Sequence, residues 1–296
     1  TQAVRNRMRL LMNAADAAEM HNPIHCVSNF RWPCTVIYND REVWYDAAVR
    51  WVDYPGGLAL ITTTNAAFWK GLEPARLSKN VSRDGDLQIL RWRGGTLESR
   101  KAEFNRFTVR NPGPTEPAHV LLQLTSEIEG AGWGEAVVRG KEFVGLVFAQ
   151  GGNFCQAVPA PFIRTVLDAQ RQGTYRGIGY FDFTWQPTEN PETQRYLKVP
   201  GEGRGVVVID VADKPGVTPV LHPRDVLLEV DGFAIDNQGD YVDPAYGHLL
   251  LENLATRGKW AGDTVRFKVW RDGRALDVDY VLPKIQEAGR LVPESP

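Results

Sequence analysis

A glycine-dense stretch, EGAGWGE from Glu129 to Glu135, has the form of a turn that could present a catalytic nucleophile. An apolar hairpin, AVVRGKEFVGLVF, follows it directly, and such a hairpin would hold the turn rigidly at the edge of a sheet. The nucleophiles expected on a turn of this kind are Ser, Thr and Cys, and it contains none of them. The stretch therefore combines the backbone of a nucleophile site with side chains that cannot attack a substrate.

The other residues that could do chemistry are five histidines and three cysteines: His21, His25, His119, His222, His248, Cys26, Cys34 and Cys155. None of them stands in a zinc-type arrangement. His21 and His25 are four residues apart, but Pro23 between them argues against one continuous helix. We expect no metal and no cofactor. The cysteines either form a Cys26–Cys34 bridge across a hairpin or remain unpaired, buried thiols.

Length and charge exclude several classes of protein. A chain of 296 residues predicts about two domains. The formal net charge of -2 provides no strong field to recruit nucleic acid or an anionic membrane surface. No run of about 18 apolar residues indicates a membrane-spanning helix. The first residues, TQAVRNRMRLLMNAAD, are too polar for a signal peptide, so any export signal would lie upstream or have been removed.

The elements that must position these residues are mostly strands. Up to about residue 155, short β-rich segments alternate with Asn-Asp and Tyr-Pro-Gly-Gly turns, which predicts a β-barrel or sandwich. The stretch AVPAPFIRTVLDAQRQG then becomes helical, with Phe162, Val166 and Leu167 on one face and Gly173 as the stop.

A second, compact unit of mixed structure follows a proline-containing connection with a short helix, PETQRYL. It contains the apolar strand RGVVVIDV, the segment DVLLEVDGFAID, a helix near YGHLLLENLATRG, and a final hairpin. The turn of that hairpin is RDGR, because Asp-Gly favours a tight type I′ turn.

Two stretches of this unit, RGVVVIDVADKPGVTPVLHPRDVLLEVDGFAID and WAGDTVRFKVWRDGR, resemble the PDZ domain of the HtrA/Deg family, in which a trypsin-like double β-barrel precedes a PDZ domain. Arg224 stands where the family usually has Gly. The family pattern is kept at Asp225, Val226, Leu227, Asp231, Gly232, Gly262, Asp263, Arg271, Asp272 and Gly273.

The resemblance also implies a site for a peptide carboxylate, in the loop TYRGIGYFDFTWQ from Thr174 to Gln186. It places the carboxylate on backbone N–H groups around four positions: Arg176, Gly177, Ile178 and Gly179. Glycines let consecutive amides converge on an anion, and an edge strand accepts an added peptide strand. The alternative is that these glycines only shape a linker turn.

The N-terminal half resembles the family's three catalytic segments in their order. RMRLLMNAADAAEMH resembles the strand that ends in the catalytic His and puts Ala15 at that position. DAAVRWVDYPGGLALI resembles the segment with the catalytic Asp and puts Gly57 there. In the glycine-dense stretch, Gly130 and Gly134 match the glycines around the catalytic Ser and put Gly132 at the nucleophile.

A catalytic triad needs a nucleophile, a base that accepts its proton and a carboxylate that orients the base. Alanine and glycine supply none of these, so the resemblance implies a catalytically inactive pseudoprotease. Trp133 and Glu135 would obstruct an oxyanion hole rather than serve one, although Trp133 could instead fill the core. The side chains that could replace the triad are His21, His25, Asp53 and Ser126, and we expect each to be structural or at the surface.

We therefore expect a mostly β protein: a trypsin-like double β-barrel, N-terminally truncated relative to the family, followed by a PDZ domain. The expected parts are a degenerate protease domain over 1–172, a PDZ domain over 173–285 and a polar tail over 286–296. The chain begins close to the family's His segment, so either upstream sequence completes the first barrel or a partner does.

The expected role is a scaffold or assembly subunit that binds proteins or peptides at their C-termini or exposed strands. The resemblance further implies a homo-oligomer and a periplasmic or otherwise exported setting. Two alternatives remain: an active serine endopeptidase with an unrecognised triad, and a structural subunit that uses its nine Trp residues as interface anchors.

Overall fold

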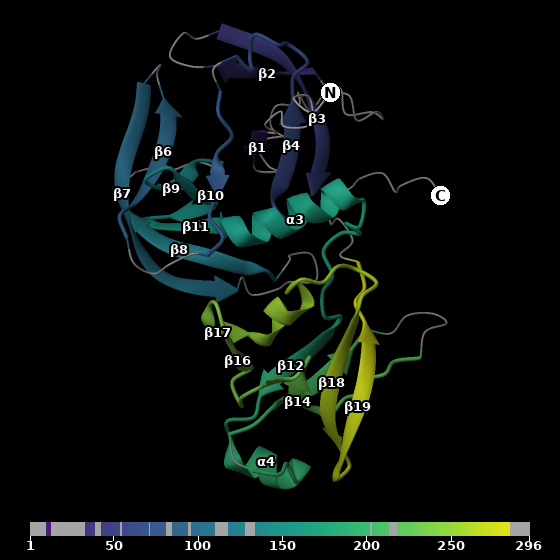
Figure 1. The fold of residues 1–296 in the computed structure, drawn as a ribbon. Coiled ribbons are helices and arrows are strands. Elements are labelled where there is room, and N and C mark those ends of the chain that lie inside the picture. The colour runs from purple at the N-terminus through teal and green to yellow at the C-terminus, as the bar shows by residue number, and fades with distance from the viewer. Residues whose placement is uncertain are drawn as a thin grey trace. The chain divides into compact units, whose positions relative to one another are not determined.

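The computed structural model of the chain describes residues 10–12, 33–38, 43–53, 55–70, 72–80, 85–93, 96–109, 118–127, 134–201, 203–212 and 218–284. The chain divides into two compact units. The N-terminal unit comprises Thr1–Arg106 and Leu121–Arg171, and the C-terminal unit comprises Phe107–Val120 and Gln172–Pro296. Strands dominate both units, as Figure 1 shows, so the predicted mostly β fold class is confirmed.

The N-terminal unit begins with a four-stranded antiparallel sheet in the order β1-β4-β3-β2. Its strands are β1 (Leu10–Met12), β2 (Pro33–Tyr38), β3 (Val43–Asp53) and β4 (Leu58–Thr62). Along β3, Ala47 and Val49 are buried whereas Asp46 and Arg50 are exposed, which is the alternation of a strand with one face on a core. Ala47 and Val49 belong to one apolar cluster with Ile61 and Phe68.

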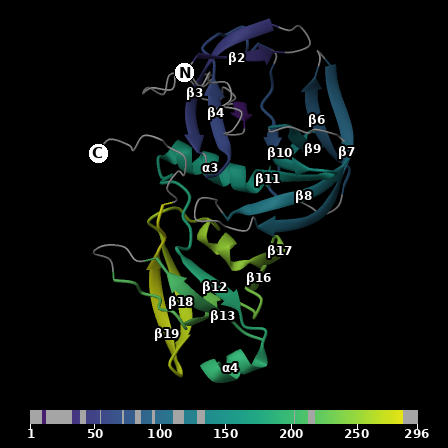
Figure 2. The same ribbon diagram turned by 180° about the vertical axis from the view of Figure 1, so that it is seen from behind.

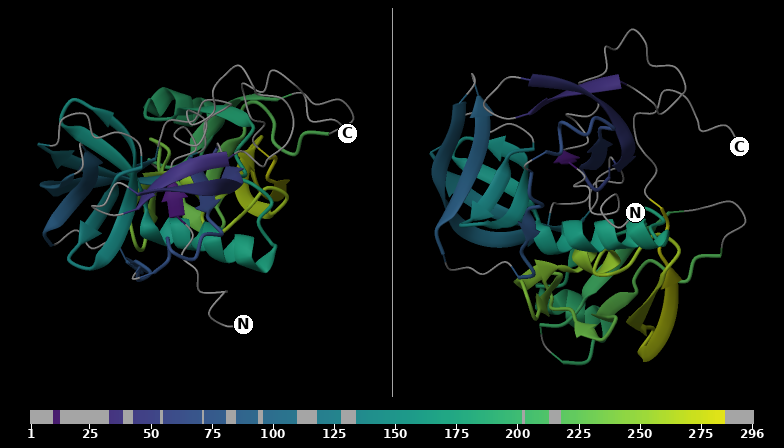
Figure 3. Two further views of the ribbon diagram at one scale, coloured as in Figure 1. Left: turned by 90° about the horizontal axis from the view of Figure 1, so that it is seen from above. Right: turned by 45° about the horizontal axis from the view of Figure 1, so that its top comes forward.

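A second sheet of seven strands follows in the order β11-β8-β7-β6-β9-β10-β5. Its strands are β5 (Arg76–Leu77), β6 (Leu87–Arg93), β7 (Thr96–Val109), β8 (Val120–Ser126), β9 (Ala136–Arg139), β10 (Glu142–Gly151) and β11 (Phe154–Pro159). Because β10 also pairs with β11, strands β6 to β11 close into a ring. Figure 3 shows these blue and teal strands curving around toward one another. The strand pattern predicted a β-barrel or a sandwich, and this unit contains a barrel.

Strand β10 pairs irregularly with two of its neighbours. Its register with β9 shifts between Phe143 and Gly145, and its register with β11 shifts between Val147 and Ala149. A bulge bends its strand and increases the local twist, which helps a sheet to curve.

The predicted helix after the barrel is confirmed as α3 (Ala160–Gln172), and Gly173 ends it with a φ of 72°. Its buried face consists of Ala160, Phe162, Ile163, Val166 and Ala169. Leu167, expected on that face, is half-buried. No helix among the described residues is long and apolar enough to cross a membrane.

The C-terminal unit contains a sheet in the order β12-β13-β14-β18-β19, with β15 paired to β14, and a separate hairpin of β16 and β17. The strands are β12 (Phe183–Pro187), β13 (Val206–Val211), β14 (Val226–Val230), β15 (Phe233–Ala234), β16 (Asp240–Asp243), β17 (Gly247–Leu250), β18 (Thr264–Arg271) and β19 (Arg274–Val281). Figure 2 shows this unit from behind, with the β18–β19 hairpin in yellow. Strands β12 and β19 are the two ends of the sheet order.

Aromatic side chains fill the core between these two end strands. Phe183, Phe267 and Tyr280 contact one another edge to face, with ring centroids 5.5 to 5.9 Å apart. Phe181 stacks on Phe183 at 5.4 Å. The hydroxyl of Tyr280 accepts a hydrogen bond from the N–H of Asp182 at 2.9 Å, so this core fixes the approach to β12.

The predicted short helix is confirmed as α4 (Pro191–Leu197). Asn190 caps it by accepting a hydrogen bond from the N–H of Glu192, and Pro191 takes a first-turn position where its missing N–H costs nothing. The predicted type I′ hairpin is also present, because Asp272 and Gly273 have φ values of 46° and 82° between β18 and β19.

The helix predicted near YGHLLLENLATRG is wrong over most of its length. Residues Gly247–Leu250 form β17, and only Leu251–Ala255 are helical, as the 3₁₀ helix η3. Pairing with β16 determines this outcome, since it holds Gly247–Leu250 in register with Asp240–Asp243. Leu249, Leu251 and Leu254 are buried, and a short apolar run of this kind does not by itself distinguish a helix from a strand.

Candidate functional site

The position that resemblance assigns to the catalytic Asp lies in the turn between β3 and β4. Gly57 is buried there with a φ of 63°, a conformation that favours glycine. Asp53, the alternative acid, is the last residue of β3 and pairs in register with Leu58. It is 7% exposed. A buried carboxylate therefore lies across the same turn as Gly57. The other two triad positions, Ala15 and Gly132, lie outside the described residues.

The alternative nucleophile, Ser126, is a structural residue at the end of β8. Its hydroxyl donates a hydrogen bond to the carbonyl of Lys101 at 3.0 Å, and its N–H donates to the carbonyl of Asn153 at 3.1 Å. No histidine occurs among the residues of the N-terminal unit that the structure describes. His21, His25 and Trp133 lie outside them. The described part of this unit thus contains no serine–histidine pair.

The end of the glycine-dense stretch is fixed to the ring by main-chain hydrogen bonds. The N–H of Gly134 donates to the carbonyl of Val147, and the N–H of Val147 donates to the carbonyl of Glu135, both at 2.8 Å. The nearby Cys155 is fully buried. Burial, together with the negative charge of Glu135, raises the pKa of its thiol. Because the thiolate is the nucleophilic form, this cysteine is poorly suited to replace a catalytic Ser.

The structure places the four candidate carboxylate-binding residues, Arg176 to Gly179, in the segment between α3 and β12. The carbonyl of Gly177 accepts a hydrogen bond from the N–H of Ala261 at 3.0 Å, and the N–H of Tyr180 donates to the carbonyl of Pro283 at 3.3 Å. Gly179 forms a β-bridge with Lys284. Among the described residues, these bonds leave the N–H groups of Gly177, Ile178 and Gly179 without a main-chain acceptor.

Two glycines in this loop have a structural reason, which is the positive φ at Gly177 and close packing at Gly179. Gly177 has a φ of 96°, and a Cβ there would lie 2.9 Å from Cε of Lys284. A Cβ on Gly179 would lie 2.9 Å from Cβ of Leu282. Residues 177 to 179 are buried, whereas Arg176 is exposed. The loop is therefore packed under the segment that follows β19.

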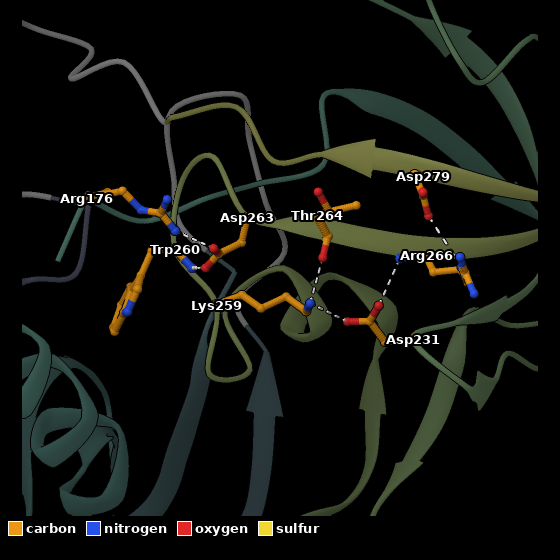
Figure 4. A network of polar contacts seen from close by, with 8 residues as sticks. All are labelled: Arg176, Asp231, Lys259, Trp260, Asp263, Thr264, Arg266 and Asp279. Carbon is orange, nitrogen blue, oxygen red and sulfur yellow. Dashed lines mark hydrogen bonds and ion pairs between the residues drawn. The ribbon is translucent and has the colours of Figure 1, made fainter. Parts of the chain in front are cut away.

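Arg176 is held by an ion pair with Asp263, which Figure 4 shows. Asp263 also accepts a hydrogen bond from the N–H of Trp260 at 2.8 Å. Burial opposes ionisation of Asp263, but the bond from Trp260 and the charge of Arg176 outweigh it and lower the pKa of this carboxyl. The indole of Trp260 packs edge to face on Tyr175, with centroids 4.7 Å apart. The loop preceding β18 is thus fixed against the candidate carboxylate loop.

The same network extends to β14, β18 and β19 (Figure 4). Lys259 donates to the carbonyl of Thr264 at 2.7 Å and pairs with Asp231 at 3.0 Å. Asp231 in turn accepts a hydrogen bond from the N–H of Arg266, whose guanidinium pairs with Asp279 at 3.3 Å. These contacts hold the strands in position, and they engage the cations Lys259 and Arg266 in pairs.

Beside this loop, β12 is an edge strand, with β13 as its single strand neighbour among the described residues. Trp185 in β12 donates a hydrogen bond from its indole N–H to Oε1 of Glu252 in η3 at 2.7 Å. Its ring packs so closely on Gly239 that a Cβ at that position would collide with it. The strand edge therefore lies beside a buried carboxyl group, and no sequence motif indicates this feature.

Within the described part of the chain, no group of three or more His, Cys, Asp or Glu side chains could hold a metal ion. No protein-family model matches the chain.

Curated relatives come from Arabidopsis thaliana. Protease Do-like 2, chloroplastic, is 26% identical over 253 residues, which are 82% of this chain and 41% of that protein. Do-like protein 13 of the same plant is 22% identical over 255 residues, 84% of this chain and 51% of that protein. The chain thus spans about half the length, or less, of each curated relative that it matches.

Solved structures of HtrA-type proteases are similar to this chain in fold. A variant of the HtrA-type protease AlgW with a decapeptide has a TM-score of 0.67 at 19% identity, covering 97% of this chain and 81% of that chain. AlgW with a tripeptide has a TM-score of 0.62 at 18% identity, covering 93% and 85%. A serine endoprotease from Yersinia pestis has a TM-score of 0.55 at 17% identity, covering 95% and 86%. Sequence relatives and solved structures together support homology of this chain to the HtrA/Deg-type trypsin-like serine proteases.

Proposed function

We propose that the chain is a non-catalytic HtrA/Deg-like pseudoprotease that binds extended peptide segments or protein C-termini. One observation carries the binding role. A glycine-built loop, with three N–H groups that lack main-chain acceptors among the described residues, leads directly into the edge strand β12. Amides of this kind bind a carboxylate, and a strand edge binds an extended chain.

The loss of catalysis is inferred from the residues at the triad positions. Ala15, Gly57 and Gly132 have no side chain that could act as base, acid or nucleophile. In the described residues, Ser126 uses its hydroxyl in a main-chain hydrogen bond, and the pKa of the Cys155 thiol is raised. Each substitute that can be located is thus unsuited to the nucleophile's role.

The similar proteins support a peptide ligand. AlgW has been solved with a decapeptide and with a tripeptide. Under this proposal the C-terminal unit is a PDZ domain, with Arg176, Gly177, Ile178 and Gly179 as its carboxylate loop. A homo-oligomer or larger assembly and an exported, periplasmic setting complete the proposal, on the strength of the resemblance. The net charge of -2 argues against a nucleic-acid partner.

Labelling with a serine-reactive fluorophosphonate tests the loss of catalysis. We expect no covalent adduct on the folded chain by mass spectrometry, because an unactivated hydroxyl does not attack the probe. Trypsin treated in parallel is the positive control. An adduct on the folded chain that is absent after heat denaturation would identify an active serine endopeptidase, and the proposal would be abandoned.

Binding requires a separate measurement, with peptides whose C-terminus is either free or amidated. We expect the free carboxylate to bind at least about tenfold more tightly, because amidation removes the charge that the loop amides accept. Fluorescence anisotropy on the full chain measures both affinities. Equal affinity of the two forms would eliminate the carboxylate loop and leave only strand addition at β12.

A further inference from the structure

A buried carboxyl group beside β12 has only part of its hydrogen-bonding capacity used. Glu252 is 8% exposed, and its Oε1 accepts the hydrogen bond from Trp185. Its Oε2 is buried and has no hydrogen-bond partner among the described residues. Buried polar atoms are nearly always paired in folded proteins, so an unpaired one calls for an explanation. The hydrogen bond from Trp185 thus satisfies Oε1 of Glu252, and Oε2 remains without a hydrogen bond among the described residues.

The charges around Glu252 are negative. Burial raises the pKa of Glu252, against hydrogen bonds from its own N–H and from Trp185, and the charge of Asp240 raises it further. Burial and the neighbouring Asp236 raise the pKa of Asp240, which only His248 lowers. Glu252, Asp240 and Asp236 together form what we call the acidic cluster. No positively charged group is among those that shift the pKa of Glu252, the most buried residue of the acidic cluster.

The acidic cluster adjoins the strand edge through Trp185. This residue belongs to β12, and its indole connects that strand to Glu252. Side chains of a strand added to β12 would alternate between two faces, and those beside Trp185 would lie on the side of the acidic cluster. A side chain of the bound segment is therefore the group best placed to meet Glu252.

We propose that the acidic cluster selects a lysine or arginine side chain in the segment that adds to β12. This inference rests on the proposed peptide-binding function and gives it a specificity. The ammonium or guanidinium group donates a hydrogen bond to Oε2 of Glu252 and supplies the positive charge that Glu252 lacks. Because Oε2 is buried, side chains around it must move to admit the cation. Trp185 is half-buried, belongs to the contacted strand and bonds the other oxygen of the same carboxyl group.

A metal ion fits this place less well than a basic side chain. No group of three or more His, Cys, Asp or Glu side chains with metal-binding geometry occurs in the described residues. Asp236 also uses its Oδ1 to accept the N–H groups of Gln238 and Asp240, each at 2.9 Å. One or two carboxyl oxygens suffice for a lysine or arginine, whereas Ca²⁺ takes six to eight oxygen ligands.

The test is a selection of decapeptides with a free C-terminus from a fully randomised synthetic library, with the 296-residue chain as bait. We expect Lys and Arg to be enriched about tenfold over Met and Gln at one position of the selected peptides. Glu252→Gln should reduce that enrichment to about twofold or less, because the amide keeps the acceptor for Trp185 but has no charge. Glu192→Gln is the matched control, since Glu192 is exposed on α4 and should leave the enrichment unchanged.

The outcomes separate this inference from the function on which it rests. If no peptides are enriched, the peptide-binding function itself is wrong. If peptides are enriched without a basic position, or with one that Glu252→Gln retains, the specificity is wrong and the binding function stands. If Glu252→Gln does not fold, Asp240→Asn takes its place. It should lower the preference for Lys and Arg at least about threefold, and an unchanged preference would overturn the inference.

Discussion

Two residues of the C-terminal unit adopt states that sequence alone could anticipate only in part. Arg224 has a φ of 77°, a conformation that costs a residue with a Cβ about 1 kcal/mol or more. Its guanidinium lies over the ring of Tyr196, 5.2 Å from the centroid. The resemblance predicted glycine here, and the backbone explains why. The burial of Glu252 could not be predicted, because its partner Trp185 is distant in sequence and the surrounding LLLENLA has no sign of it.

The raised pKa of Glu252 predicts how its replacement depends on pH. Its pKa in the folded protein lies above the usual 4.5, so the protonated form favours folding. As the pH rises above about 4.5, Glu252 ionises in the unfolded chain before it ionises in the folded protein. The free energy of unfolding therefore falls until Glu252 is ionised in both states. Glutamine does not titrate. We therefore expect Glu252→Gln to gain stability relative to the wild type as the pH rises from 4.5 to 8.

Urea unfolding of the full chain at both pH values measures this difference. Asp240, whose pKa is raised in the same direction, is present in both proteins, but its charge interacts with that of Glu252, so its titration contributes to the measured difference. A difference between Glu252→Gln and the wild type that stays flat with pH would mean that the carboxyl group of Glu252 is hydrated in solution.

At the scale of elements, local signals were predictive where one turn or cap decides the structure. The α4 helix follows from its Asn190–Pro191 start, and the β18–β19 hairpin follows from Asp-Gly. The conformation of Gly247–Leu250 could not be predicted in this way. It depends on pairing with β16, and no local sequence signal indicates that pairing. The resemblance assigns Gly177 and Gly179 to a carboxylate-binding loop, which stays a prediction, and no sequence signal indicated their contacts with Leu282 and Lys284.

The β18–β19 turn supports a second prediction. Gly273 has a φ of 82°, and no atom lies within 4 Å of the place that a Cβ would take, so Gly273→Ala changes backbone strain alone. We expect it to destabilise the chain by about 1 to 2 kcal/mol in urea unfolding. Asp272→Asn should stay within about 0.5 kcal/mol, because Asn tolerates positive φ equally well. If Gly273→Ala costs nothing, the turn is not type I′ in solution.

For the whole molecule, the sequence predicted the mostly β class and the presence of a barrel. The family-derived domain names and the boundary between residues 172 and 173 stay predictions. So does the inactive triad, because only Gly57 of the three positions is among the described residues. Relating Ala15, Gly57 and Gly132 to one another requires the distances between three distant segments, which no local pattern supplies.

Restoring one catalytic residue tests whether the loss is complete. We expect Gly132→Ser to remain unlabelled by fluorophosphonate, because a serine without a base and an orienting acid has no activated hydroxyl. Mass spectrometry of the intact chain gives the readout, and wild type provides the baseline. An adduct on Gly132→Ser would show that a base is already in place and that the alignment at Ala15 is wrong.

The closure of β6 to β11 restricts how the length of this chain can change. In an open sheet an end strand can slide by one residue and disturb one neighbour, but in a ring every strand has two. Deleting one residue inside β8 would thus put half of its side chains on the wrong face against both partners. Strand β10 already has a register shift toward β9 and another toward β11, so an added or missing residue there changes an existing bulge rather than a regular ladder. Insertions and deletions should therefore accumulate in the connections and, within the ring, at β10.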